Sequence, residues 1–115
     1  MAGALGGVIG AIISGMESHG HKSPPVALIA AFLLVSIEEG LSVLEYAERG
    51  KIPVSTMSRH LLDLGDRNRK GEPGMGLITS RANLLDNRRR EYMLTAKGHA
   101  LREKLGMAMQ RAAEV

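Results

Sequence analysis

The residues best suited to chemistry in this sequence are its clustered cations. Arg88, Arg89 and Arg90 are consecutive and follow Asp86 by two positions. Guanidinium groups bind phosphate or guanine through paired hydrogen bonds. A charge run of this kind is also common on a solvated surface that has no specific partner. Whether these arginines bind a polyanion therefore depends on the elements that hold them.

Charge is unevenly distributed along the 115 residues. Residues 1–48 carry one lysine against five carboxylates, whereas residues 49–104 carry thirteen Lys and Arg against six Asp and Glu. The formal net charge is +3. This asymmetry predicts a basic middle segment that faces a polyanion and an apolar, acidic beginning that is used for packing.

Motifs of enzymes and metal sites are missing from the sequence. It contains no P-loop, no glycine-rich turn of the dinucleotide-binding type and no H-E-x-x-H. It contains no cysteine, which excludes disulfides and cysteine-ligated zinc. His19 and His21 lie two residues apart in a glycine-containing loop, which is weak evidence for a metal site. We expect no enzymatic activity, no metal and no cofactor.

No segment has the length and apolarity of a membrane span, which needs about 20 apolar residues. Residues 1–16 lack charge but contain five glycines, and no charged region precedes them as in a signal peptide. Together with the lack of cysteine, these features predict a cytoplasmic protein without a membrane partner. A chain of 115 residues suits a single domain, 1–115, with one modest core.

Two start signals and an apolar run predict the first helices. Val26–Ile37 is apolar almost throughout and predicts a buried helix. Ser42 and Glu45 have the spacing of a capping box, which predicts a short helix that ends near Gly50. Pro53 suits the first turn of a further helix. Two short helices joined by a link with glycine are typical of a helix-turn-helix.

The second of these short helices has a predicted outward face. Its buried stripe consists of Met57, Leu61 and Leu64. The residues expected to face outward are Val54, Ser55, Ser58 and Arg59, with Thr56 and His60 at the margins. Serine and threonine can bond phosphates or bases, and arginine can contact guanine. The alternatives are helix capping by Ser55 or Thr56 and a solvated Arg59.

The arginine run is placed by the elements that follow. Gly65–Gly76 predicts a basic loop that contains Arg67, Arg69 and Lys70. This loop either extends the preceding helix by a turn and contacts phosphate or is disordered. Two predicted strands, Leu77–Arg81 and Arg90–Leu94, then form a hairpin, and the arginines lie at its tip and return strand. Ala96–Ala113 predicts a closing helix with Leu101 and Leu105 on one face.

Helices, a helix-turn-helix, a hairpin and a helix follow the order of a winged helix. At residues 26–115 the sequence resembles the multiple-antibiotic-resistance regulator (MarR) family. LSVLEYAERGKIPVSTMSRHLLDL (41–64) is similar to its helix-turn-helix, and GLITSRANLLDNRRREYMLTAKG (76–98) to its wing. The family's D-x-R-x-x-x-x-x-L-T-x-x-G signature matches at Asp86, Arg88, Leu94, Thr95 and Gly98.

The resemblance implies a mainly α-helical fold with a small β-hairpin wing. It makes Arg88 the wing arginine for a minor groove, with Arg89 beside it and Asp86 as the residue that orients a nearby arginine. STMSR (55–59) falls on the recognition helix. Gly65–Gly76 departs from the family by its length, which leaves the spacing of helix and wing on DNA open. Family members often bind small ligands, but no residue here identifies an effector.

The two ends of the chain predict an interface between subunits. The first segment has apolar residues at helical spacing, interrupted by four glycines; they include Leu5, Val8, Ile9 and Ile12. It is either a frayed end or half of a dimer interface to which Leu101 and Leu105 contribute. We therefore assign residues 1–22 and 96–115 to dimerisation and residues 26–95 to a DNA-binding core.

These observations predict a homodimeric regulator that binds double-stranded DNA of specific sequence. Two half-sites bound by a symmetric dimer imply a pseudo-palindromic operator. The alternatives are a phage- or plasmid-type winged-helix replication or architectural factor with little sequence preference, and a winged helix that binds protein. Nothing in the sequence identifies the operator, the regulated genes or the direction of regulation.

Overall fold

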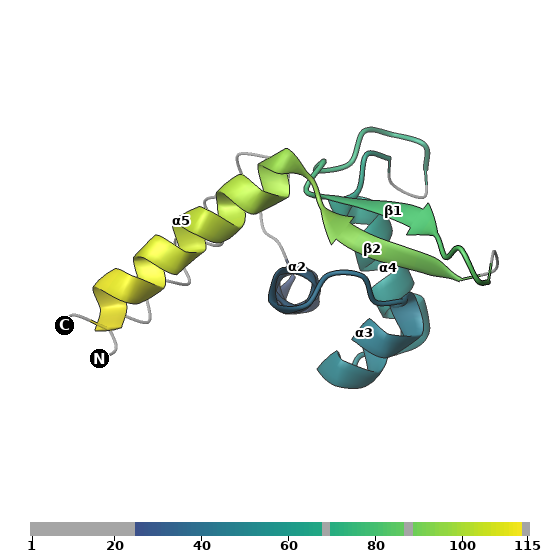
Figure 1. Cartoon of the computed structure of the whole chain (residues 1–115), viewed down its shortest axis with the longest axis horizontal. Helices are drawn as coiled ribbons and strands as arrows, with labels where there is room; N and C mark the ends of the chain where they lie inside the picture. The colour runs from purple at the N-terminus through teal and green to yellow at the C-terminus, as the bar shows by residue number, and fades with distance from the viewer. Residues whose placement is uncertain (1–24, 68–69, 87–88, 114–115) are drawn as a thin grey trace.

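The computed structural model describes residues 25–67, 70–86 and 89–113 (Figure 1). Three helices are followed by a hairpin and a long helix. Their order is α2 (Val26–Ile37), α3 (Val43–Gly50), α4 (Val54–Leu64), β1 (Ile78–Ala82), β2 (Arg90–Leu94) and α5 (Ala96–Ala113). The predicted fold class, a mainly α-helical winged helix-turn-helix, is confirmed. The predicted N-terminal segment 1–22 lies outside the described residues.

Helix α2 is the central helix of the domain. Its sequence is apolar, and Leu28, Ala31, Phe32 and Val35 are buried. It packs against α3 and α4 and also contacts β2 and α5. The buried cluster joins these side chains to residues of every other element, including Tyr46, Leu61, Ile78 and Leu94. Burial of this one cluster fixes α3 and α4 relative to the hairpin.

The wing is an antiparallel hairpin with a short addition at its second edge. In β1 and β2, Ile78 pairs with Leu94 and Ala82 with Arg90. On the other side of β2, Leu41 forms an isolated bridge with Tyr92, whose amide donates to the Leu41 carbonyl at 3.1 Å. The segment between α2 and α3 is therefore hydrogen-bonded to the wing.

A close backbone contact holds the start of α5. The amide of Thr95 donates to the carbonyl of Leu77 at 3.0 Å, and its hydroxyl donates to Gly76 at 2.6 Å. The same hydroxyl accepts from the amide of Gly98 at 3.1 Å, as an N-cap does. A Cβ at position 98 would overlap the Leu77 carbonyl oxygen. The close approach of the Leu77 carbonyl therefore explains why position 98 is a glycine.

The loop between α4 and β1 folds back onto the end of α4. Helix α4 ends at Leu64, so one of the two alternatives for this loop, the extension of the helix by a turn, is excluded. Backbone amides at positions 74–77 donate to carbonyls at 66, 63, 65 and 64. Gly74 is required there, because a Cβ would overlap the Gly65 carbonyl oxygen. Met75 is buried. The described part of the loop is thus anchored at both ends.

Leu101 and Leu105 of α5 belong to the core of this single chain. Their exposed fractions are 3% and 4%. They were expected at a dimer interface, and that assignment remains a prediction. Because both side chains are buried, a substitution at either residue disturbs the fold of one subunit and cannot by itself test a dimer interface. Beyond this buried stretch, α5 extends away from the helix-turn-helix (Figure 1).

Candidate nucleic-acid interface

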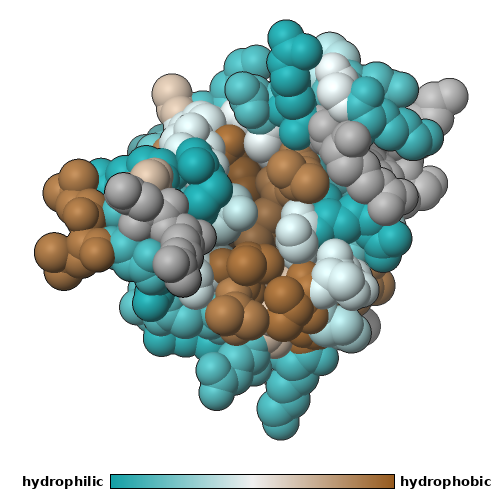
Figure 2. Space-filling model, turned by 90° about the vertical axis from the view of Figure 1, so that its right-hand side faces the viewer, coloured by the Kyte–Doolittle hydropathy of each residue, from teal (hydrophilic) through white to brown (hydrophobic). Residues whose placement is uncertain are grey.

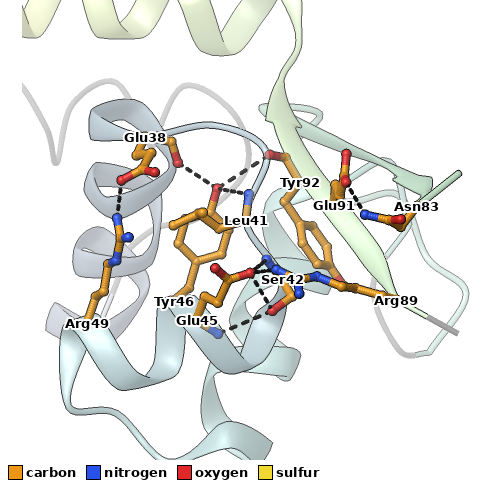
Figure 3. Close-up of polar contacts among 10 residues, drawn as sticks. All are labelled: Glu38, Leu41, Ser42, Glu45, Tyr46, Arg49, Asn83, Arg89, Glu91 and Tyr92. Atoms are coloured by element: carbon orange, nitrogen blue, oxygen red, sulfur yellow. Dashed lines mark hydrogen bonds and ion pairs between the residues drawn. The ribbon is translucent and has the colours of Figure 1, made fainter. Parts of the chain in front are cut away.

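The helix-turn-helix begins with a complete capping box. The amide of Glu45 donates to Ser42 Oγ at 3.3 Å, and the amide of Ser42 donates to Glu45 Oε1 at 3.1 Å (Figure 3). These bonds satisfy two amides that have no partner within α3. The capping box predicted from the sequence is confirmed.

The turn between α3 and α4 is short and tightly bonded. Lys51 adopts the left-handed conformation with φ of 53° and ends α3. The amide of Ile52 donates to the Ala47 carbonyl at 3.0 Å, and the Ile52 side chain packs against the core. Pro53 then precedes α4 and accepts a hydrogen bond from the amide of Met57 at 2.9 Å. These contacts fix the angle at which α4 leaves the turn.

Helix α4 has one buried and one exposed face. Met57, Leu61 and Leu64 are at most 1% exposed, as predicted. Ser55 and Arg59 are exposed, and Thr56 and Ser58 are half-buried. Arg59 forms no ion pair with another residue of the described part of the chain, and its side chain lies on the exposed face of α4.

His60 corrects the sequence interpretation. We expected it at the margin of α4, but it is 8% exposed. It lies three residues after Met57 and four before Leu64, which is the spacing of the buried stripe. The helical periodicity therefore predicts that His60 is buried, whereas its polar side chain suggested a more exposed position.

Two of the three wing arginines are described, and both have partners within the chain. Arg89 forms an ion pair with Glu45 of the capping box (Figure 3). Arg90 donates from Nε to Ser80 Oγ at 3.0 Å and from Nη2 to the Ser80 carbonyl at 3.3 Å. Arg89 therefore joins the wing to the helix-turn-helix, and Arg90 joins the two strands. The sequence alone indicated neither contact.

Asn83 organises the wing tip. Its Oδ1 accepts the amides of Leu85 at 2.8 Å and Asp86 at 3.1 Å, and its Nδ2 donates to Glu91 Oε1 at 2.5 Å. Its own amide donates to the Arg89 carbonyl at 2.8 Å. The tip therefore has a defined backbone on either side of residues 87–88. Sequence reasoning missed this residue, although asparagine is a common turn former.

Two of the remaining predicted site residues lie outside the described part of the chain, and the other three are exposed. Arg88 and Arg69 lie outside the described residues. Asp86 is exposed, and its carbonyl accepts from the amide of Arg89 at 3.0 Å. Arg67 and Lys70 are exposed in the loop after α4, and Arg67 Nη1 donates to the Gly71 carbonyl at 3.4 Å.

A hollow of about 410 Å³ lies between α3 and the wing. Its lining residues are Ser42, Val43, Leu44, Asp86, Arg89, Arg90 and Tyr92. Arg89 crosses from the wing towards the N-terminus of α3 (Figure 3), so the ion pair lies beside this hollow. The face that contains the wing end has hydrophobic groups surrounded by hydrophilic ones (Figure 2). It therefore combines apolar contact area with charged groups.

Within residues 25–67, 70–86 and 89–113, no three His, Asp or Glu side chains are grouped so that they would hold a metal ion. In the same part of the chain, no helix combines the length and apolarity that crossing a membrane requires.

The capped helix-turn-helix, hairpin and closing helix define a winged helix. No protein-family model matches the sequence, and no curated protein matches it. Solved structures, in contrast, do match this chain. A MarR family transcriptional regulator from Silicibacter pomeroyi has a TM-score of 0.61 at 21% identity, over 96% of this chain and 67% of that one.

Two further solved structures share the fold. FabT of Streptococcus pneumoniae, in complex with DNA, has a TM-score of 0.67 at 16% identity, over 90% of this chain and 68% of that one. PcaV of Streptomyces coelicolor, in complex with its natural ligand, has a TM-score of 0.61 at 22% identity, over 89% of this chain and 67% of that one. The chain has the winged-helix fold of MarR regulators, as its sequence motifs predicted.

Proposed function

We propose that this protein is a transcription regulator that binds double-stranded DNA of specific sequence. Helix α4 enters the major groove, where Ser55, Thr56, Ser58 and Arg59 face bases and phosphates. The observation that carries this proposal is the exposed polar face of α4, on a helix whose other face is fully buried. FabT, a winged helix of the same fold, was solved in complex with DNA, which supports the same use here.

The wing and the basic loop supply the second set of contacts. Arg88, at the position of the family's wing arginine, enters the minor groove, with Asp86 orienting a neighbouring guanidinium. Arg89 contacts a phosphate when its ion pair with Glu45 opens. Arg67, Arg69 and Lys70 contact the backbone beside the major groove. These contacts set affinity and position, whereas α4 sets the sequence preference.

The regulator acts as a homodimer on a pseudo-palindromic operator. Residues 1–22 and 96–115 form its dimerisation region, and residues 26–95 bind DNA. The interface includes Leu5, Val8, Ile9 and Ile12 from one end of the chain and the exposed side of α5 from the other. It is a cytoplasmic protein without enzymatic activity. PcaV was solved with its natural ligand, which supports a small-molecule effector for this chain also, of unassigned chemistry.

Selection of bound duplexes from random DNA tests the proposal. We expect an enriched motif with two related half-sites and an affinity that falls steeply with salt. Binding without an enriched motif would instead indicate the replication or architectural factor. The protein-binding alternative predicts no salt-dependent DNA binding at all.

A further inference from the structure

The wing tip has two fully exposed leucines. Leu84 is 99% exposed and Leu85 is 98% exposed, whereas the other large apolar side chains on the described surface range from 43% to 83%. A single exposed leucine needs no explanation. Two adjacent ones that project from the end of a hairpin form an apolar tip with no covering side chain in the described chain.

The backbone that carries this tip is fixed. Asn83 accepts the amides of Leu85 and Asp86 through one oxygen, and it is bonded across the hairpin to Glu91 and to the carbonyl of Arg89. The amide of Arg89 closes the turn by donating to the Asp86 carbonyl at 3.0 Å. The backbone at Leu85 is therefore hydrogen-bonded within the wing, which lowers the cost of ordering this part of the chain on binding.

The surroundings of the tip favour a polyanion as the partner. Arg81, Arg89 and Arg90 flank the leucines on the two strands and their junction with the tip. They face the carboxylates of Asp86 and Glu91, the latter paired with Arg81 at 3.3 Å, so the described tip keeps an excess of one positive charge. The tip also belongs to the same domain as the exposed face of α4, because the Arg89–Glu45 ion pair joins the wing to α3 and α3 packs against α4. With α4 in a major groove, the wing of this domain reaches the adjacent minor groove. Leucine is one of the side chains that proteins insert between base steps there.

We propose that Leu84 and Leu85 form an apolar wedge that enters the minor groove and opens a base step of the bound DNA. This inference rests on the proposed DNA-binding function and adds to it a deformation of the DNA. The wedge unstacks one step and bends the duplex, so it favours flexible pyrimidine–purine steps at a fixed distance from the half-site. It gives the protein sequence preference at base pairs that no polar side chain contacts.

The experiment compares the full-length protein, the double variant Leu84→Ser/Leu85→Ser and Ile37→Ser. Ile37 is an 80% exposed apolar residue at the end of α2, so its variant removes a similar surface outside the wing. All three bind a duplex selected from random DNA, with 2-aminopurine placed in turn along each flank and a fluorophore at each end. Circular dichroism melting checks the fold of both variants, which alter only exposed side chains.

We expect the wild type and Ile37→Ser to raise 2-aminopurine fluorescence at one flanking step and to shorten the distance between the ends. The double variant should lose both signals and bind about tenfold more weakly, since it no longer buries the leucines. Wild-type binding without unstacking or bending overturns the wedge and leaves the DNA-binding function standing. Failure of the wild type to bind any duplex overturns both.

Vesicles of phosphatidylserine provide the last arm, since a basic surface with apolar residues can also bind an anionic membrane. The wedge predicts no difference in vesicle binding between the wild type and the double variant. Vesicle binding that depends on the two leucines, together with bending that does not, assigns the tip to a lipid surface and overturns the wedge.

Discussion

Arg89 of the wing and Glu45 of α3 form an ion pair across the junction between the hairpin and the helix-turn-helix. The same Glu45 oxygen accepts hydrogen bonds from the amide and hydroxyl of Ser42, both at 3.1 Å. One carboxylate oxygen thus caps α3 and holds the wing. The ion pair that joins the wing to the helix-turn-helix therefore depends on a residue whose sequence position indicated only a helix cap.

A double-mutant cycle with Glu45→Gln and Arg89→Gln should give a coupling of about 0.2–1 kcal/mol in the free energy of unfolding. The value is small because the two side chains are 35% and 43% exposed. Glutamine keeps the capping box, so the cycle isolates the ion pair. The matched control is Arg49–Glu38, whose side chains are 48% and 49% exposed and which should couple more weakly. Equal coupling in the two cycles would show that the Arg89 pair has no special role.

Gly98→Ala should destabilise the fold by at least about 2 kcal/mol, because the added Cβ overlaps the Leu77 carbonyl oxygen at the start of α5. Gly106→Ala is the control in the same helix, since a Cβ there meets nothing within 4 Å. It should stabilise the fold by about 0.5–1 kcal/mol through the higher helix propensity of alanine. Urea unfolding of both variants measures the difference. Similar values for the two would contradict the close contact.

Tyr46→Phe should lower the free energy of unfolding by about 1 kcal/mol near neutral pH, because the hydroxyl donates to the Glu38 carbonyl at 2.7 Å (Figure 3). Burial raises the pKa of Tyr46 above its ordinary value of 10.0, and the nearby carboxylates of Glu39 and Glu38 add to this effect. The folded state therefore holds the proton more tightly than the unfolded chain. This contribution to stability is complete below pH 10.0 and is lost as the pH rises through the folded-state pKa.

Unfolding experiments from about pH 9 to about pH 11 measure this loss. Tyr46→Phe should lose less stability over that range than the wild type. Burial also raises the pKa of Tyr92, so Tyr92→Phe should remove a separate part of the alkaline loss. A wild type that loses no more stability at alkaline pH than the combined variant Tyr46→Phe/Tyr92→Phe would contradict both assignments.

The sequence predicted the elements whose signals are local. The Ser42–Glu45 spacing defines a cap within one helical turn, and the apolar run Val26–Ile37 coincides with α2. The predicted start of the first strand, Leu77, is one residue early, because the Leu77 backbone bonds to Leu64 and Thr95 instead of β2. Contacts between distant segments produced that difference, and a single sequence does not reveal them.

The candidate site was less predictable than the fold for the same reason. Ser55 and Arg59 follow from helical periodicity, and the structure places both on the exposed face of α4. The partners of Arg89 and Arg90 come from other elements, so a run of three arginines gave no indication that their side chains would separate. The exposure of Leu84 was not predictable from the sequence, since an apolar residue in a turn has no local signal for exposure.

Arg59→Ala should relax the base preference at one position of each half-site, because its guanidinium lies on the exposed face of the proposed recognition helix. Arg67→Ala, in the loop after α4, should instead weaken binding to all sequences alike and reduce the salt dependence. Repeating the selection from random DNA with both variants separates the two effects. If Arg59→Ala selects the wild-type motif unchanged, the base contacts belong to other residues.

The dimer prediction needs a residue that is apolar and exposed in one subunit. Leu105→Asp does not serve, because Leu105 is 4% exposed and the charge would disrupt the core of the subunit itself. Met107 lies on the same helix and is 58% exposed, the one large exposed apolar residue among the described side chains of α5.

Met107→Asp should weaken the dimer by at least about tenfold, since it would bury an unpaired charge between subunits, and leave urea unfolding of the monomer unchanged. Leu44→Asp is the control, because it places the same charge at a 63% exposed leucine of α3. Deletion of residues 1–16 should also weaken the dimer and lower operator affinity, since two half-sites are then no longer bound together. Sedimentation equilibrium at micromolar concentration measures each dimer. A monomeric wild type would remove both the interface and the pseudo-palindrome, and a Met107→Asp variant that dimerises as tightly as the wild type would exclude the exposed side of α5.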